Sequence, residues 1–219
     1  MNKSKRLKQW DVYLVMDLQG HGPFNALELA RQAIDGGIKV IQIREKNMGN
    51  PDYLRLALPI RELCKTKQVD FIINDRIDLA LRLQADGVHL GQDDIPEGAI
   101  RDEIGEDMIL GISASSTDEA RRGIRVGADY LGVGAIYPTF SKSDAGDAVS
   151  PSLIQDIRHF SDLPIVGIGG IQLGRATPVI VAGGNAVAVI SAICQAPSPV
   201  EAARKLQVEV REAKQRVTD

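Results

Sequence analysis

A short apolar stretch, residues 40–46 (V-I-Q-I-R-E-K), carries three polar side chains at alternate positions. Successive side chains of an extended strand point to opposite faces, so Gln42, Arg44 and Lys46 share one face. An arginine and a lysine side by side are suited to bind the oxygens of a phosphate or another anion. The same two cations could instead be solvated at the strand end or paired with Glu45. The stretch indicates an anion site and leaves a surface role open.

Acidic residues follow the next two apolar stretches. The sequence N-D-R at 74–76 ends the first, and A-D-G-V-H-L-G-Q-D-D at 85–94 contains the second. Mg²⁺ accepts one or two carboxylates and takes its other oxygens from water and substrate phosphate. The pattern predicts that Asp75 and Asp94 bind Mg²⁺ beside Asn74. Asn and Asp before a helix are also ordinary N-caps, so capping is the alternative.

Hydroxyl groups and a further cation come later in the chain. Ser113 ends an apolar stretch, where its hydroxyl could face a ligand or cap the following helix. The loop at 137–146 (Y-P-T-F-S-K-S-D-A-G) has the composition of a mobile lid. Lys142 on this loop could close over an anion, while Thr139 and Ser141 supply hydroxyls. An exposed, flexible lysine is the alternative.

Two late segments are suited to hold a second anion. Residues 167–171 read G-I-G-G-I, and residues 189–193 read V-I-S-A-I. Glycines let backbone N–H groups approach a phosphate closely, although such a pair can also form nothing more than a tight turn. Gly169, Ile190 and Ser191 are therefore candidates for a monophosphate site. Together with the cations and carboxylates, they predict two phosphorylated small-molecule ligands.

Regular alternation of short β-branched runs with amphipathic segments determines how these residues are positioned. The predicted strands are 12–16, 40–44, 71–74, 87–90, 108–113, 130–134, 165–168 and 186–190. Strands alternating with helices form a parallel sheet, and eight units of about 25 residues favour a closed (β/α)₈ TIM barrel over an open doubly wound sheet. The carboxyl ends of barrel strands share one mouth, with a common phosphate site after strands seven and eight. His89 lies inside the fourth strand and is predicted to be a hydrogen-bonded core residue.

Size and composition favour one enzyme-sized domain. The chain has 219 residues, 44% of them hydrophobic, so residues 12–219 can form one barrel domain behind a solvated tail at residues 1–11. A net charge of −3 and 4% aromatic residues do not fit a nucleic-acid-binding protein. No apolar run is long enough for a membrane span, and no apolar segment follows the basic N-terminus as in a secretory signal. Cys64 and Cys194 lack metal-ligand spacing, which fits free thiols in a reducing cytoplasm.

Seven motifs, in this order, resemble those of the thiamine-phosphate synthase family. They are I-Q-I-R-E-K, I-N-D-R-I-D-L-A, A-D-G-V-H-L-G-Q-D-D, L-G-I-S-A, Y-L-G-V-G-A-I-Y-P-T-F-S-K, P-I-V-G-I-G-G-I and A-V-I-S-A-I. The resemblance implies a TIM-barrel transferase that joins hydroxymethylpyrimidine diphosphate to a thiazole phosphate and releases pyrophosphate with Mg²⁺. It implies that the pyrimidine diphosphate is bound by Gln42, Arg44, Lys46, Asn74, Ser113 and Lys142, of which Arg44, Lys46, Ser113 and Lys142 are catalytic. It also implies that Mg²⁺ is bound by Asp75 and Asp94. The thiazole phosphate would be bound by Thr139, Ser141, Gly169, Ile190 and Ser191.

Three departures and three alternatives accompany this resemblance. Ala135 stands where the family frequently has proline, and Ser141 replaces a common threonine while keeping the hydroxyl. Ser115 stands where the family commonly has histidine, which affects the pyrimidine side of the site. A thiazole tautomerase shares the barrel but lacks parts of the diphosphate and metal apparatus, which is intact here. A phosphosugar isomerase or lyase would need no second substrate, and a non-catalytic phosphate sensor would bind without turnover. A homo-oligomer is compatible with the sequence.

Overall fold

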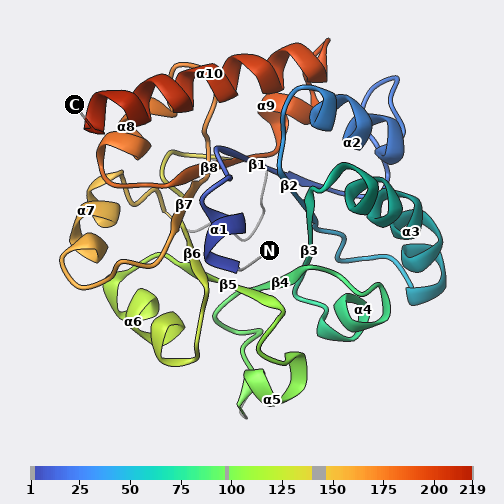
Figure 1. The fold of residues 1–219 in the computed structure, drawn as a ribbon, viewed down its shortest axis with the longest axis horizontal. Helices are drawn as coiled ribbons and strands as arrows, with labels where there is room; N and C mark the ends of the chain where they lie inside the picture. The colour runs from blue at the N-terminus through green and yellow to red at the C-terminus, as the bar shows by residue number, and fades with distance from the viewer. Residues whose placement is uncertain (1–2, 97–98, 140–146, 219) are drawn as a thin grey trace.

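The computed structural model describes residues 3–96, 99–139 and 147–218. Eight parallel strands pair in sequence order and close into a barrel, since β8 also pairs with β1 (Figure 1). The strands are β1 (Val12–Met16), β2 (Val40–Ile43), β3 (Asp70–Asn74), β4 (Gly87–Leu90), β5 (Ile109–Ala114), β6 (Tyr130–Val133), β7 (Ile165–Ile168) and β8 (Ala186–Val189). Each strand begins and ends within about one residue of its predicted bounds. The predicted TIM barrel is confirmed, and the open sheet is wrong.

Helices surround this barrel, except for α1, which lies across one end of it (Figure 1). They are α1 (Lys3–Leu7), α2 (Ala26–Asp35), α3 (Asn50–Lys67), α4 (Ile77–Arg82), α5 (Ile100–Ile104), α6 (Thr117–Arg125), α7 (Ser152–Arg158), α8 (Thr177–Val181), α9 (Ser191–Cys194) and α10 (Pro199–Thr218). Side-chain caps fix some starts: the Asn25 carboxamide accepts from the Glu28 N–H, and the Ser116 hydroxyl accepts from the Glu119 N–H. Such caps satisfy N–H groups that the first turn leaves unpaired. None of the helices in the described part of the chain is long and apolar enough to cross a membrane.

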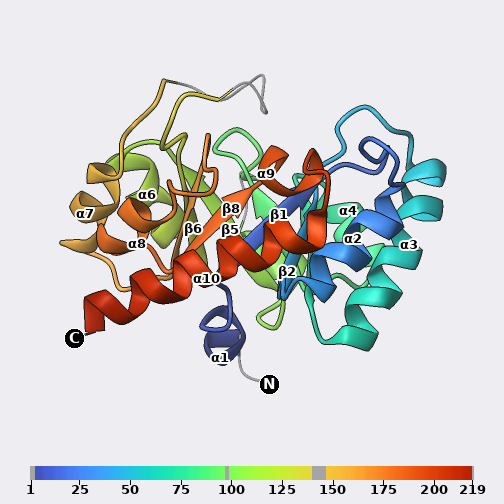
Figure 2. The same cartoon turned by 90° about the horizontal axis from the view of Figure 1, so that it is seen from above.

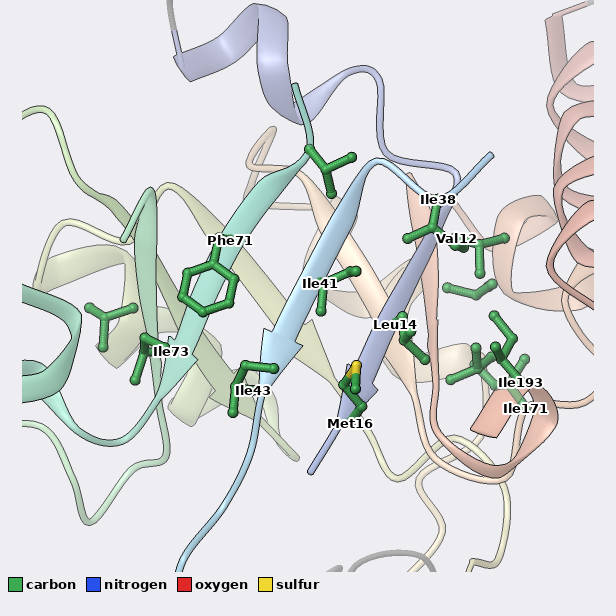
Figure 3. Packing of buried hydrophobic residues seen from close by; sticks show 14 of the residues in the cluster. Val12, Leu14, Met16, Ile38, Ile41, Ile43, Phe71, Ile73, Ile171 and Ile193 are labelled. Carbon is green, nitrogen blue, oxygen red and sulfur yellow. The ribbon is translucent and has the colours of Figure 1, made fainter. Parts of the chain in front are cut away.

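Side-chain alternation along the strands gives the barrel two apolar layers. The outer layer packs between the sheet and the helices, and Figure 3 shows Leu14, Ile41 and Phe71 from three neighbouring strands within it. Each such fully buried side chain contributes about 1.5–3 kcal/mol to folding. The inner layer fills the barrel and includes Tyr13 and Tyr130. Because Ile41 faces outward, Gln42 on the same strand faces the barrel interior, as the alternation predicted.

The N-terminal segment packs against the barrel, so the predicted solvated tail is wrong for residues 3–10. Helix α1 lies at the end of the barrel opposite α9 (Figure 2). Arg6 forms ion pairs with Asp70 and Asp86. The Trp10 ring is 1% exposed, and its Nε1 donates to Asp70 Oδ2 at 2.7 Å. These contacts close the amino-terminal end of the barrel, which leaves the opposite end for a ligand.

Replacing Trp10 by phenylalanine is expected to lower the free energy of unfolding by about 1–2 kcal/mol, because the buried Asp70 carboxylate loses a hydrogen bond. For a domain of this size the loss corresponds to roughly 2–8 °C in Tm. Thermal denaturation followed by circular dichroism measures the effect. Lys5→Ala, at an exposed position of α1, is the matched control and should change Tm little. An unchanged Tm in Trp10→Phe would show that the segment adds no stability.

Candidate active site

A cavity of about 740 Å³ opens at the carboxyl ends of the strands. This volume lies in the range of small-molecule sites. All predicted site residues that fall in the described part of the chain line the cavity: Gln42, Arg44, Lys46, Asn74, Asp75, Asp94, Ser113, Thr139, Gly169, Ile190 and Ser191. Ser141 and Lys142 lie outside the described residues. The structure therefore brings together groups that are up to about 150 positions apart in the chain, as the barrel geometry predicted.

Strand β2 supplies the cationic side of the cavity. Gln42 is 5% exposed, and its Nε2 donates to Tyr13 Oη at 2.8 Å. The backbone N–H of Arg44 donates to Met16 O at 2.8 Å, which extends the β1–β2 pairing to the rim of the cavity. Arg44 is half-buried there, whereas Lys46 is exposed, with its Nζ 3.8 Å from Asp75 Oδ2. This side of the cavity can hold a highly charged anion.

The carboxylates of Asp75 and Asp94 lie close together beside these cations. Burial, and then the negative charge of Asp94, raises the pKa of Asp75 above its ordinary value, with Lys46 acting in the other direction. Asp75 is not a helix cap, since α4 begins after Arg76 without a side-chain cap. Among the described residues no three His, Cys, Asp or Glu side chains could hold a metal by themselves. A pair of carboxylates that repel each other fits Mg²⁺, which takes one or two carboxylates and completes its shell with water and phosphate oxygens.

Ser113 and His89 form part of the cavity floor. His89 Nε2 lies 2.9 Å from Ser113 Oγ, and His89 Nδ1 lies 2.9 Å from Tyr130 Oη. His89 is therefore hydrogen-bonded, as predicted, although it also lines the cavity. The capping role considered for Ser113 is wrong, because Ser116 caps α6 instead. The Ser113 hydroxyl is thus held at the cavity surface by a neighbouring ring.

The loops after β6, β7 and β8 meet on the other side of the cavity. Gly169 has φ +102°, and a Cβ there would lie 2.6 Å from Ala135 Cα, so the position requires glycine. The hydroxyl of Ser191 accepts from Gln172 Nε2 at 3.1 Å. Arg175 stacks on the Tyr137 ring, with its guanidinium carbon 5.5 Å from the ring centroid. Close-packed backbone, a hydroxyl and a cation make this side suitable for a smaller anion.

Several lining residues are absent from the sequence predictions, and four of them carry polar or charged groups into the cavity: Tyr13, Tyr130, Gln172 and Arg175. Tyr13 and Tyr130 are inward-facing strand residues that the alternation rule could have identified. Gln172 and Arg175 follow the predicted glycine-rich turn, but no sequence signal showed that this loop folds back over the cavity.

Comparisons with known proteins agree with this arrangement. The family model for thiamine monophosphate synthase matches residues 12–193. A thiamine-phosphate synthase of Moorella thermoacetica is 45% identical over 208 residues, covering 95% of this chain and 99% of the relative. A second one, of Haloarcula marismortui, is 43% identical over 208 residues, covering 94% of this chain and 99% of the relative.

A solved structure gives the same result. Thiamine phosphate pyrophosphorylase from Pyrococcus furiosus matches with a TM-score of 0.85 and 33% sequence identity, covering 95% of this chain and 98% of that chain. The family model spans most of the chain, and the relatives align over nearly their whole length. The chain therefore belongs to the thiamine monophosphate synthase family.

Proposed function

We propose that this protein couples hydroxymethylpyrimidine diphosphate to a thiazole phosphate, forming thiamine phosphate and pyrophosphate. The observation that carries the proposal is one cavity with two different anion-binding sides. Cations and paired carboxylates lie on the β2–β4 side, which suits a metal-bound diphosphate. The glycine-rich loops after β7 and β8 suit a monophosphate. A tautomerase or an isomerase would need one of these sides alone.

The reaction needs a leaving group that departs easily and a nucleophile held nearby. Arg44 and Lys46 bind the diphosphate oxygens and stabilise the negative charge that develops as the bond to the pyrimidine methylene breaks. Asp75 and Asp94 would hold Mg²⁺, which would supply further positive charge to the diphosphate. Asn74 and Ser113 orient the pyrimidine diphosphate. No protein nucleophile is required, because the thiazole nitrogen attacks the methylene carbon directly.

The second substrate is held by its phosphate. Gly169, Ile190 and Ser191 bind this phosphate and point the thiazole ring at the methylene carbon. Thr139 and Ser141 add hydroxyls from the loop after β6, and Lys142 on the same loop binds the diphosphate. The free, buried thiols of Cys64 and Cys194 fit a reducing compartment, for which we propose the cytoplasm.

Pyrophosphate release tests the proposed function. The full-length protein is given Mg²⁺ with the pyrimidine diphosphate alone, with the thiazole phosphate alone, and with both. We expect rapid, equal formation of pyrophosphate and thiamine phosphate from the complete mixture, slow release without the thiazole, and loss of both products with EDTA. Metal-independent conversion of the thiazole alone would favour a tautomerase, and binding without turnover would favour a sensor.

Arg175→Gln is expected to raise the KM for thiazole phosphate about five- to thirtyfold, because a charge-assisted hydrogen bond contributes about 1–2 kcal/mol at an exposed site such as this one. Steady-state kinetics at saturating pyrimidine diphosphate measure this change. The thiazole alcohol, which lacks the phosphate, is the matched control substrate and should react equally with both proteins. Tyr137→Phe keeps the ring under Arg175 and should have a smaller effect. An unchanged KM in Arg175→Gln would place the phosphate away from this side chain.

A further inference from the structure

Five side chains from five strands form a continuous row of hydrogen bonds across the barrel interior. Gln42 Nε2 donates to Tyr13 Oη at 2.8 Å, and Tyr13 Oη lies 2.9 Å from Tyr130 Oη. Tyr130 Oη lies 2.9 Å from His89 Nδ1, and His89 Nε2 lies 2.9 Å from Ser113 Oγ. The row begins at one residue proposed to contact the pyrimidine diphosphate and ends at another. Between them lie three side chains that the proposed reaction does not use.

The rings of this row are held tightly in place. A Cβ at Gly111 would lie 2.2 Å from Tyr130 Cζ, and a Cβ at Gly132 would lie 2.8 Å from His89 Cε1. The Trp10 ring packs edge-on against Tyr130 with centroids 5.1 Å apart. Glycines on β5 and β6 thus make room for the two rings, while Trp10 of the N-terminal segment packs against the Tyr130 ring. A row packed in this way has little freedom to exchange partners.

Each of the two buried tyrosines has one hydroxyl hydrogen that needs a hydrogen-bond acceptor. Burial raises the pKa of Tyr13 and of Tyr130 above the ordinary value, so both hydroxyls keep their protons. The oxygen of Tyr13 already accepts from Gln42, and the described residues offer its hydrogen one acceptor, the oxygen of Tyr130. A buried donor without an acceptor costs about 1–3 kcal/mol, so Tyr13 donates to Tyr130.

The same requirement determines which atom donates in each remaining hydrogen bond of the row. Since the Tyr130 oxygen accepts from Tyr13, its own hydrogen goes to His89 Nδ1, which must carry no proton. A neutral imidazole with an unprotonated Nδ1 carries its proton on Nε2 and donates it to Ser113 Oγ. The Ser113 hydroxyl then has its hydrogen left to donate into the cavity. All four hydrogen bonds therefore run in one direction, from Gln42 to Ser113.

We infer that Tyr130 and His89 are positioning residues that fix Ser113 as a hydrogen-bond donor to the pyrimidine diphosphate. The ligand atom at Ser113 is consequently an acceptor, such as a ring nitrogen or a phosphate oxygen, and a ligand that presents an N–H there is rejected. The inference rests on the proposed function for the identity of the ligand. The direction of the row depends on the protein alone.

The tautomer of His89 tests the direction without any substrate. Long-range ¹H–¹⁵N NMR spectra of the full-length protein distinguish a proton on Nδ1 from one on Nε2, and His89→Gln assigns the signal among the 3 histidines of the chain. We expect a neutral ring protonated on Nε2, with Nδ1 accepting a hydrogen bond that Tyr130→Phe removes. A ring protonated on Nδ1, or on both nitrogens, would overturn the inference even if the protein proves to be a synthase.

A double-mutant cycle tests whether the row acts through Ser113. Tyr130→Phe keeps the ring and should lower kcat/KM for the pyrimidine diphosphate about tenfold, with the KM for thiazole phosphate within about twofold of wild type. In a Ser113→Ala background the same change should have almost no further effect, because its target is gone. Equal losses in both backgrounds would overturn the positioning role. His89→Gln gives a second cycle if Tyr130→Phe does not fold, and the tautomer of the wild-type protein is decisive even if no turnover is found.

Discussion

Arg44→Ala is expected to lower kcat/KM for the pyrimidine diphosphate by about a hundredfold, with the fold intact. Arg44 is half-buried at the cavity rim, where a guanidinium can bind two phosphate oxygens at once in a low-dielectric setting. A hundredfold loss corresponds to about 2.7 kcal/mol of transition-state stabilisation, within the range for charge-assisted hydrogen bonds. Steady-state kinetics with each substrate varied in turn measure the loss, and circular dichroism checks the fold.

Two related variants separate charge from geometry. Arg44→Lys keeps the positive charge but loses the planar fork, so it should recover part of the activity. Lys46→Ala should cost less, about tenfold, because Lys46 is exposed and its charge is screened by solvent. Near-normal turnover in both alanine variants would show that Arg44 and Lys46 are solvated residues at a strand end and do not bind the diphosphate.

The barrel could be predicted because its signal is local and repeated. Each strand is a short β-branched run, and each is followed by a segment with helical periodicity, so neighbouring elements support the same architecture. The alternation inside a strand then assigns side chains to a face, which is why Gln42 was placed correctly opposite Ile41. Parallel strands ending at one mouth bring distant residues together without any further information.

The N-terminal segment could not be predicted in the same way. Its basic residues are typical of a solvated tail, and its partners, Asp70 and Asp86, are more than 60 positions away in the chain. Trp10 becomes buried only because the barrel offers it an apolar end and a carboxylate. Contacts of this kind depend on the folded surface, which local patterns do not describe.

The sequence predicted the charged residues that line the cavity better than the neutral ones. Cations and carboxylates clustered just after the ends of buried strands are unusual enough to indicate function, whereas Tyr13 and Tyr130 look like ordinary strand residues. Arg175 was missed because it lies on an irregular loop that reaches the cavity by folding back. The structure adds these residues through geometry alone.

Asp75→Asn and Asp94→Asn are each expected to raise the Mg²⁺ concentration for half-maximal turnover by about tenfold or more, since each removes an anionic oxygen that the hard cation prefers. Titration of pyrophosphate release with Mg²⁺ measures the change. Asp93→Asn is the matched control, because Asp93 lines the same cavity but, unlike Asp94, is not among the groups that shift the pKa of Asp75, so it should change the titration little. Unchanged titrations for both Asp75→Asn and Asp94→Asn would show that the metal binds elsewhere.

When Mg²⁺ is absent, Asp75→Asn should not destabilise the folded protein, although it weakens the proposed metal site. The pKa of Asp75 is raised in the folded protein, chiefly by burial and then by Asp94, so folding favours its protonated form. Its contribution to stability is therefore lost as the pH rises through the pKa of the unfolded carboxyl group, about 4, and on through the raised pKa of the folded protein. Asp75→Asn removes this cost and suits the backbone there, because φ is 59° and asparagine tolerates that conformation. We therefore expect its Tm without Mg²⁺ to equal or exceed that of the wild type, increasingly so as the pH rises above about 4, while Mg²⁺ raises its Tm less. A lower Tm at every pH would mean that the charge of Asp75 stabilises the fold, which contradicts the idea that its ionised form is destabilising until a cation binds.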